Sequence, residues 1–127
     1  MENLVKEFFR QGSFAVCGSF RDETKYAYKI LKVLVKKGCK VYPVNPHLSE
    51  VDGLKCYKSV SDIPFKVDVV NFVTPPAVTE KIVKECFKKD IKKVWFQPGA
   101  ESENAIAFCR NNGISSIHGL CVMIEWM

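Results

Sequence analysis

The chain has 127 residues, a formal net charge of +5, and hydrophobic and charged fractions of 47% and 26%. These values are ordinary for a globular protein, and the length predicts one domain covering residues 1–127. The longest apolar runs, such as residues 67–73, are too short for a membrane span. Residues 1–9 contain acids and no small-residue cleavage site, so we expect no signal peptide and a cytoplasmic location.

The cysteines are even in number, but their wide and irregular spacing gives little support to a metal site. No pair has the C-x-x-C spacing, and the chain has only two histidines to complete a zinc site. Free cysteines in apolar runs behave as small core residues. We therefore predict reduced and mostly buried thiols at Cys17, Cys39, Cys56, Cys86, Cys109 and Cys121.

The lysines fall into two groups that are typical of solvated surfaces. Lys25, Lys29, Lys32 and Lys36 recur at helical intervals, and a second group lies within residues 88–93. No aromatic-lined basic strand pattern of the RNA-binding type is present, so we expect no nucleic-acid partner. The excess of positive charge favours an anionic ligand.

Apolar runs of strand length alternate with helical periods along the chain. The run at residues 67–73 is nearly continuous, as in a strand that is buried on both faces. Predicted strands cover residues 14–17, 39–44, 55–57, 67–73, 94–96 and 114–117. Predicted helices cover residues 24–37, 74–89 and 101–111, with inward faces made of Ala27, Ile30, Leu31 and Leu34 in the first and of Val78, Ile82, Cys86 and Phe87 in the second.

This alternation predicts βαβ units, which place parallel strands in one sheet with helices on both faces. The expected fold class is α/β: a single Rossmann-like doubly wound domain with a mostly parallel sheet of five to six strands. Such sheets bind ligands outside the carboxyl ends of their strands, where the strand order reverses. The residues that follow each strand are therefore the candidates for a binding site.

The segment after the first strand begins with Gly18 and Ser19. The G-x-G-x-x-G fingerprint of NAD sites is absent, because Gly18 is the only glycine here. The turn can still offer backbone N–H groups and a hydroxyl to a phosphate, with Arg21 and Lys25 nearby to supply charge. We expect a larger residue at position 18 to block a ligand more than it disturbs folding. A plain turn with Ser19 or Asp22 capping the next helix explains the same residues.

The second strand ends in Val44, Asn45 and Pro46. A NAD site presents an Asp or Glu at this position to the adenosine ribose, and a carboxylate would repel a phosphate attached to that ribose. The neutral end, followed by His47, tolerates such a phosphate. Asn-Pro is also a common turn signal, and the two interpretations are compatible.

Two later segments complete the set. Thr74 fits a helix N-cap, and Pro75 and Pro76 fit the first helical turn that follows. Gln97 and Gly99 lie in a polar, turn-forming loop that can reach the same cleft. Structural need explains both segments about as well as binding does.

Taken in order, these segments resemble the small, stand-alone CoA-binding domain proteins. The resemblance covers residues 12–125, and that family is similar in turn to the N-terminal CoA-binding domain of the succinyl-CoA synthetase α subunit. The matching motifs are A-V-C-G-S (15–19), V-Y-P-V-N-P (41–46), G-L-K-C-Y-K-S-V-S-D-I-P (53–64), V-D-V-V-N-F-V-T-P-P (67–76), V-W-F-Q-P-G-A (94–100) and G-I-S-S-I-H-G-L-C-V-M-I-E (113–125).

The resemblance implies that coenzyme A is the ligand and that its ADP half lies across the point where the strand order reverses. The implied contacts are Gly18, Ser19, Phe20 and Arg21 with the phosphates, Val44, Asn45 and Pro46 with the adenosine, Thr74, Pro75 and Pro76 on the opposite side, and Gln97 and Gly99 toward the pantetheine. The chain departs from the family at Cys17, where glycine is usual, and in the bulkier, more charged turn at residues 20–22.

No catalytic constellation is present. His47 and His118 lie far apart in the sequence, and we interpret His47 as a ligand contact and His118 as structural. Asp68 and Glu125 lie in apolar segments, where a capping or buried-partner role is expected. We therefore expect a module that binds CoA or an acyl-CoA without catalysis of its own. A mixed disulfide of Cys17 or Cys121 with the CoA thiol is an alternative, although burial explains both thiols.

Two other functions stay open. One is an NAD(H)-binding redox or metabolite sensor, which a charged ribose acceptor after the second strand would support, and none is present there. The other is a CoA-binding subunit of a separately encoded acyl-CoA ligase or transferase. The sequence leaves a protein partner or homo-oligomer open, and no membrane partner is expected.

Overall fold

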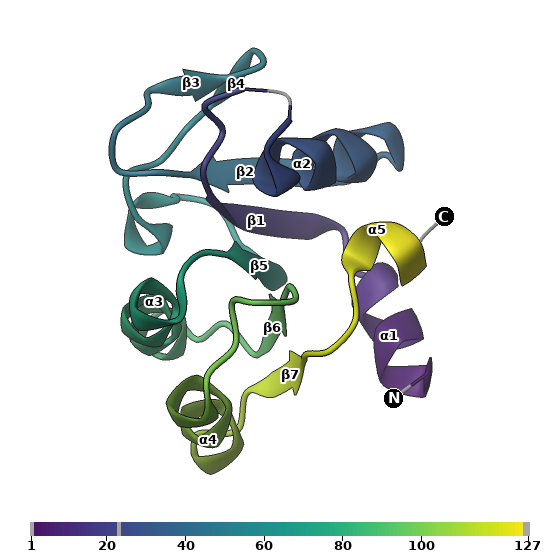
Figure 1. Ribbon diagram of the computed structural model, residues 1–127, viewed down its shortest axis with the longest axis vertical. Coiled ribbons are helices and arrows are strands. Elements are labelled where there is room, and N and C mark those ends of the chain that lie inside the picture. The colour runs from purple at the N-terminus through teal and green to yellow at the C-terminus, as the bar shows by residue number, and fades with distance from the viewer. Residues whose placement is uncertain (1, 23, 126–127) are drawn as a thin grey trace.

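A five-stranded parallel sheet forms the centre of the molecule, as the sequence predicts. The computed structural model describes residues 2–22 and 24–125. Across the sheet the strand order is β2-β1-β5-β6-β7 (Figure 1). The strands are β1 (Ser13–Gly18), β2 (Lys40–Val44), β5 (Val69–Val73), β6 (Lys93–Phe96) and β7 (Ser115–Ile117).

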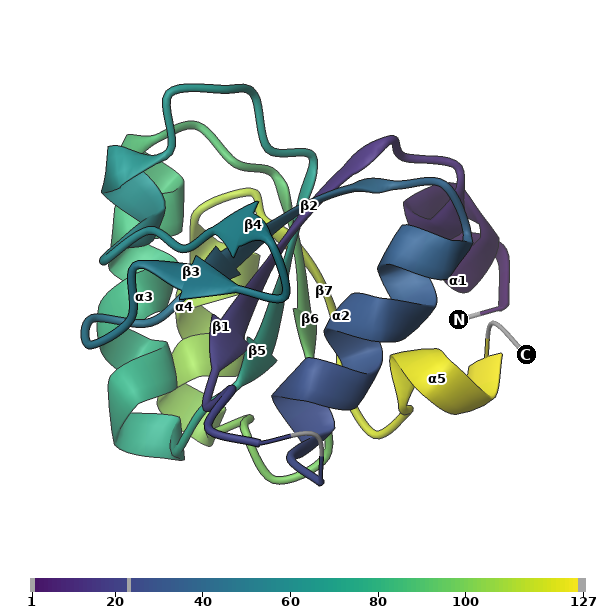
Figure 2. The ribbon, with the colours of Figure 1, turned by 90° about the horizontal axis from the view of Figure 1, so that it is seen from above.

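Helices cover both faces of this sheet. Figure 2 shows α1, α2 and α5 on one side of the strands and α3 and α4 on the other. Because β1 pairs with β2 on one side and with β5 on the other, the order reverses between β1 and β5. That reversal is where doubly wound sheets bind their ligands. The helices are α1 (Glu2–Phe9), α2 (Tyr26–Lys36), α3 (Pro76–Lys88), α4 (Glu103–Asn111) and α5 (Val122–Glu125).

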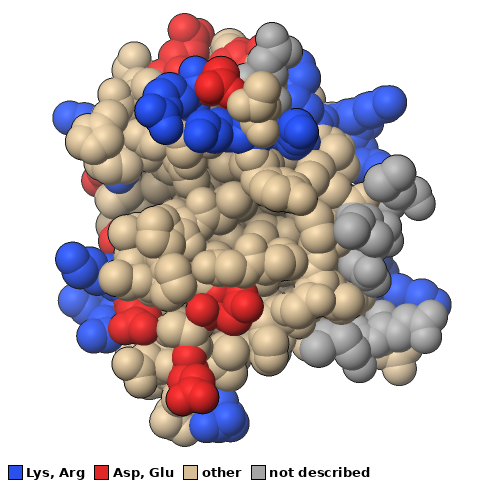
Figure 3. All heavy atoms as spheres, in the orientation of Figure 1, with Lys and Arg blue, Asp and Glu red and all other residues tan. Residues whose placement is uncertain are grey.

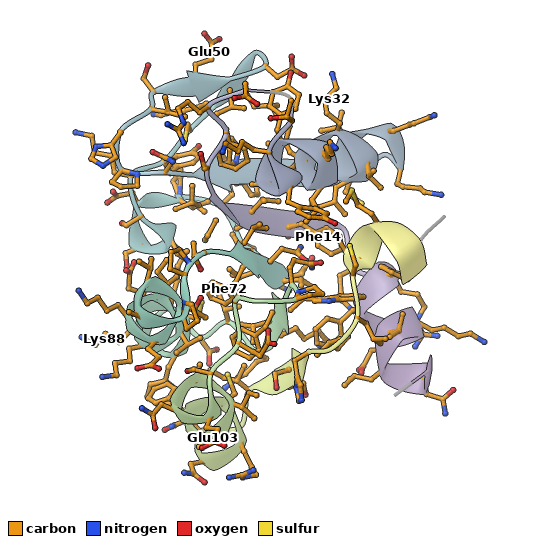
Figure 4. The ribbon with its side chains drawn as sticks, viewed as in Figure 1. Phe14, Lys32, Glu50, Phe72, Lys88 and Glu103 are labelled. Carbon is orange, nitrogen blue, oxygen red and sulfur yellow. The ribbon has the colours of Figure 1, made fainter. Side chains whose placement is uncertain are left out.

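The core has one apolar cluster on each face of the sheet. Phe14 and Phe72 are fully buried, one in each cluster, whereas the charged side chains labelled in Figure 4 project outward. Helix α2 buries the four apolar residues that the sequence predicts. All six cysteines are free, and four of them are buried: Cys17, Cys56, Cys86 and Cys109. Within the described residues, no helix combines the length and apolar character needed to cross a membrane.

Of the four residues predicted to face inward on helix α3, Cys86 is buried and Ile82 packs partly against the core, whereas the other two are exposed. Its buried residues are Thr79, Val83 and Cys86, while Val78 and Phe87 are 41% and 46% exposed. Thr79 can be buried because its hydroxyl is hydrogen-bonded at the start of the helix, 3.2 Å from the carbonyl oxygen of Pro75. A search for apolar residues counts threonine as polar. The prediction therefore placed the inward face on Val78 and Ile82, one residue before Thr79 and Val83.

The strand predicted at residues 55–57 does not join the sheet as a full strand. The chain forms a small antiparallel hairpin instead, from β3 (Glu50–Val51) and β4 (Leu54–Lys55). Tyr57 then forms a single bridge to the outer edge of β2: its N–H donates to Pro43 O, and its own carbonyl accepts from Asn45 N, both at 2.9 Å. Pro43 is tolerated within β2 because its missing N–H would face this outer edge.

Asp68 has the structural role expected of it. Its Oδ2 accepts hydrogen bonds from Gly12 N, Ser13 N and Ser13 Oγ at 3.0–3.3 Å. These bonds join the start of β1 to the segment that enters β5, at the end of the sheet away from the candidate site. The side chain of Glu125, given a similar role from the sequence, lies outside the described part of the structure.

Candidate functional site

The carboxyl ends of β1, β2 and β5 surround a cavity of about 420 Å³, called here the central cavity. Figure 3 looks onto these strand ends and shows an uncharged, hollowed surface in the middle of the face. Lys and Arg, with some Asp and Glu among them, lie along its upper rim, and further Asp and Glu lie along its lower side. The lining residues from the three strand ends are Cys17, Gly18, Ser19, Val44, Asn45, Pro46, Val73, Thr74 and Pro75.

Seven of the predicted site residues therefore meet in one cavity. The sequence missed the opposite wall, which comes from helix α3 and from the loop that enters the 3-10 helix η1 (Val60–Asp62). The signal that could have found part of this wall was the second apolar stripe of α3, which was assigned to the core. These missed residues are Lys58, Ser59, Val60, Val78, Lys81, Ile82 and Glu85.

Two further cavities flank the central one. The loop cavity, of about 290 Å³, lies beside the β1–α2 loop and contains Phe20 and Arg21. Its other lining residues are Ser19, Asn45, His47 and Leu48. The hairpin cavity, of about 570 Å³, lies beside the β3–β4 hairpin and is lined by Pro46, His47, Leu48, Ser49, Lys55, Cys56, Tyr57, Lys58, Asp62 and Pro64.

Asn45 joins the ends of β2 and β1. Its Nδ2 donates to Gly18 O at 2.8 Å, and its Oδ1 accepts from the backbone N–H of His47 at 2.8 Å. The second bond is the turn that the Asn-Pro signal predicts. Both ends of the amide are thus engaged within the protein, so Asn45 shapes the cavity walls.

Gly18 is required by packing around β1. A Cβ at this position would lie 2.7 Å from Ala27 Cβ and 2.9 Å from Val73 O, well inside van der Waals contact. A larger residue here would therefore disturb the fold itself, because the clash is with helix α2 and strand β5, whereas its effect on binding stays a prediction. Gly18 still lines the central cavity through its backbone.

The loop after Gly18 is held by Phe20, whose side chain is 5% exposed and belongs to the core cluster beneath α2. Ser19 and Arg21 are exposed beside it, where they can meet a ligand. Neither Ser19 nor Asp22 caps the helix, because the N-cap is Lys25 and carries no side-chain bond. Asp22 instead accepts hydrogen bonds from the N–H and hydroxyl of Thr24, and these bonds lower the pKa of its carboxyl.

At the start of α3 the N-cap is Pro75, not Thr74, and Pro76 occupies the first helical turn. The Thr74 hydroxyl lies 2.6 Å from that of Thr79, which draws it toward the helix interior. Thr74 and Pro75 still line the central cavity, whereas Pro76 is not among the residues that line it.

Gln97 is held by hydrogen bonds within the protein and lines only a small cavity of about 80 Å³, so its contact with pantetheine stays a prediction. It is 3% exposed; its Nε2 donates to Asn71 Oδ1 at 3.1 Å, and its Oε1 accepts from Val122 N at 3.0 Å. These bonds connect β5, β6 and α5. Gly99 has φ of +95°, which explains glycine in this turn, and its N–H donates to Glu101 Oε2. Neither residue lines the three cavities described above.

The thiols differ in their surroundings. Cys17 borders the central cavity but is only 1% exposed, and burial raises the pKa of its thiol well above the usual value. The thiolate is the reactive form, so this position suits a packing residue. Cys121 is half-buried beside a cavity of about 80 Å³ near Gln97. His118, expected to be structural, is exposed after β7.

These features define the class of protein: an α/β domain with a parallel sheet, helices on both faces, and cavities at the carboxyl ends where the strand order reverses. The family model described as "CoA binding domain" matches residues 12–127. The chain belongs to this CoA-binding domain family.

The chain is also similar to curated relatives and to solved structures. An ADP-forming acetate–CoA ligase from Methanocaldococcus jannaschii is 41% identical over 80 residues, which are 63% of this chain and 11% of the ligase. A conserved hypothetical protein from Pyrococcus furiosus has a TM-score of 0.86 and 44% identity, over 91% of this chain and 99% of that chain.

The apo form of the dinucleotide-forming acetyl-coenzyme A synthetase 1 from Ca. Korarchaeum cryptofilum has a TM-score of 0.76 and 30% identity, over 88% of this chain and 27% of that chain. The chain spans about a tenth to a fifth of the length of the curated ligases that it matches.

Proposed function

We propose that residues 1–127 form one domain that binds coenzyme A, or an acyl-CoA, through its ADP moiety. The observation that carries this proposal is the central cavity between the ends of β1, β2 and β5, in a chain of the CoA-binding domain family. A ligand placed there would lie at the reversal of strand order, where doubly wound sheets bind nucleotides.

The adenine ring fits the apolar part of this cavity. Val78 and Ile82 form a stripe on α3 that faces the cavity, beside the stripe that packs on the sheet. Val60, on the same wall as α3, and Val44, at the end of β2, add further apolar lining. Binding a planar base between these side chains would remove the exposed surface of Val78 from water, which is favourable.

The strand ends favour CoA over NAD. The residue that follows β2 is the neutral Asn45, so no carboxylate is presented to the ribose at this position. A NAD site would present a carboxylate to the ribose, whereas CoA carries a phosphate on that ribose, which a carboxylate would repel. Arg21 lies nearby and supplies a cationic group, and the His47 imidazole beside it can form a hydrogen bond.

Calorimetric titration tests this proposal. We expect CoA to bind more tightly than dephospho-CoA, and dephospho-CoA more tightly than NAD. One or two charge-assisted hydrogen bonds are worth about 1.5–3 kcal/mol, or roughly ten- to a hundredfold in affinity. The gap between CoA and dephospho-CoA should narrow as salt is added. Binding of NAD as tight as that of CoA would refute the assignment.

We further propose that the domain does not form or hydrolyse thioesters alone. One of the similar ligases is an α subunit, and a separately encoded subunit of an acyl-CoA ligase or transferase is the partner that we propose for this domain. Purified protein incubated with acetyl-CoA should leave the thioester intact. The same domain purified from its native source should bring the remaining ligase subunit with it. The free thiols fit the proposed cytoplasmic location.

A further inference from the structure

The three cavities meet at one turn, residues 45–47. Asn45 lines both the central and the loop cavity, and Pro46 lines both the central and the hairpin cavity. His47 lines both the loop and the hairpin cavity. Each pair of cavities therefore shares one residue of this turn. A ligand group that lies on the turn can extend its substituents into all three cavities.

The ribose of CoA has three substituents: the base, the 5′-diphosphate and the 3′-phosphate. We propose, on the basis of the CoA-binding function above, that each substituent occupies one cavity, with the ribose over residues 45–47. The base enters the central cavity, the diphosphate lies in the loop cavity, and the 3′-phosphate enters the hairpin cavity. NAD has only two of these substituents and would leave the hairpin cavity empty.

The charges and hydroxyls of each cavity fit this assignment. The central cavity has the apolar wall on α3, which suits a base. The loop cavity offers the exposed Ser19 hydroxyl and the Arg21 guanidinium to a diphosphate. The hairpin cavity contains Lys55 and Lys58, with His47 at its border and Asp62 as its acidic residue. Two ammonium groups in one cavity suit a phosphate dianion.

Lys58 is the residue that selects for the 3′-phosphate. It lines both the hairpin and the central cavity, and its side chain is exposed. Its backbone position is fixed because the preceding residue, Tyr57, is hydrogen-bonded in both directions to the end of β2, through Pro43 O and Asn45 N. The Lys58 side chain therefore extends from a fixed backbone position beside residues 45–47.

Lys55 lines the same cavity and adds a second positive charge. Its Nζ lies 5.4 Å from the centre of the Tyr57 ring, a cation–π contact that keeps the ammonium group at the cavity wall. Neither lysine is among the contacts expected from the sequence, where residues 55–57 were predicted as a short strand.

Three matched variants test the assignment: Lys58→Gln, Arg21→Gln and Lys40→Gln. Each removes one positive charge from an exposed side chain, and Lys40 lies at the far end of β2 from the turn. CoA and dephospho-CoA are titrated by calorimetry at low and at physiological salt, and circular dichroism checks the fold of each variant.

We expect Lys58→Gln to weaken CoA about tenfold while dephospho-CoA binding changes less than about twofold. Arg21→Gln should weaken both ligands by the same factor, since both carry the diphosphate. Lys40→Gln should change the affinity for neither ligand. A fourth variant, Lys58→Arg, should keep most of the selectivity because it retains the charge.

A folded Lys58→Gln protein that binds CoA and dephospho-CoA equally more weakly would overturn the assignment, and so would one that binds both as tightly as the original. In either case the CoA-binding function would stand. A selective loss of CoA affinity in Arg21→Gln would also overturn the assignment, because it would place the 3′-phosphate in the loop cavity. Failure of the unsubstituted protein to bind CoA at all would instead reject the proposed function together with this assignment.

Discussion

The side-chain amide of Asn45 donates a hydrogen bond of 2.8 Å to the main-chain carbonyl oxygen of Gly18. This bond joins the ends of two neighbouring parallel strands at the place where a ligand would lie across them. Because Asn45 also accepts from His47 N, the amide has one defined orientation, with its nitrogen toward β1.

Replacing Asn45 with Asp should lower the stability of the free protein. The carboxylate would keep the bond from His47 N but would face the Gly18 carbonyl oxygen with no donor, so a hydrogen bond becomes a repulsion. We expect a loss of about 1–3 kcal/mol in the free energy of unfolding, measured by urea denaturation. Asn112→Asp, at a helix end where Nδ2 donates to Phe108 O, is the control away from the site. An Asn45→Asp protein as stable as the original would show that the bond contributes nothing.

Gly18→Ala should destabilise the fold even without a ligand. The new Cβ would lie 2.7 Å from Ala27 Cβ, and neither α2 nor the adjacent β5 backbone can move away without disturbing the core. Overpacking of this kind costs about 1–3 kcal/mol. Gly12→Ala is the matched control, because a Cβ at Gly12 has no atom within 4 Å. Equal unfolding midpoints for the two variants would contradict this account of Gly18.

The outcome at Gly18 shows where sequence reasoning reaches its limit. The alternation of strands and helices predicts the layers and the parallel sheet, since periodicity depends on local chemistry. The cavity wall on α3 was missed because an apolar stripe looks the same whether it faces a core or a ligand. Similarly, a polar residue such as Gln97 looks like a ligand contact until its buried partners are known, and those partners come from segments distant in the chain.

Gln97→Ala should loosen the attachment of α5. The substitution leaves Asn71 Oδ1 and Val122 N without their partner in the protein interior, which costs about 1–3 kcal/mol. Hydrogen exchange measured by NMR should show faster exchange at the Val122 amide than in the original protein. Gln11→Ala is the control: it removes a single hydrogen bond to Glu7 O at the end of α1. It should leave the exchange rate of the Val122 amide unchanged. Unaltered protection of Val122 in Gln97→Ala would disprove the link.

Buried thiols should make the fold less stable in alkaline solution. Burial raises the pKa of the Cys109 thiol to about 11, and it also raises the pKa of Cys17 and Cys86. As the pH rises past the ordinary thiol value of about 8.5, the unfolded chain loses protons that the folded chain keeps, so unfolding becomes more favourable. The stabilisation is complete below that pH and falls by at most about 1.4 kcal/mol per pH unit for each thiol.

Urea denaturation between pH 7.5 and 10.5 measures this slope. Cys109→Ala should start from a lower stability, because it removes buried volume, but should lose stability less steeply with pH than the original protein. Contributions from lysine and tyrosine are common to both proteins and cancel in the comparison. Parallel slopes would show that Cys109 ionises equally in the folded and unfolded states.

Pro43 in β2 also affects whether a strand of another chain can pair with this edge of the sheet. An open sheet edge offers unpaired N–H and C=O groups on which a foreign strand can assemble. At this edge Pro43 has no N–H to offer, its carbonyl is taken by Tyr57, and the next outward N–H, that of Asn45, is taken as well. The same bonds that fix Tyr57, and with it the backbone of Lys58, thus protect the second half of β2 from edge-to-edge aggregation.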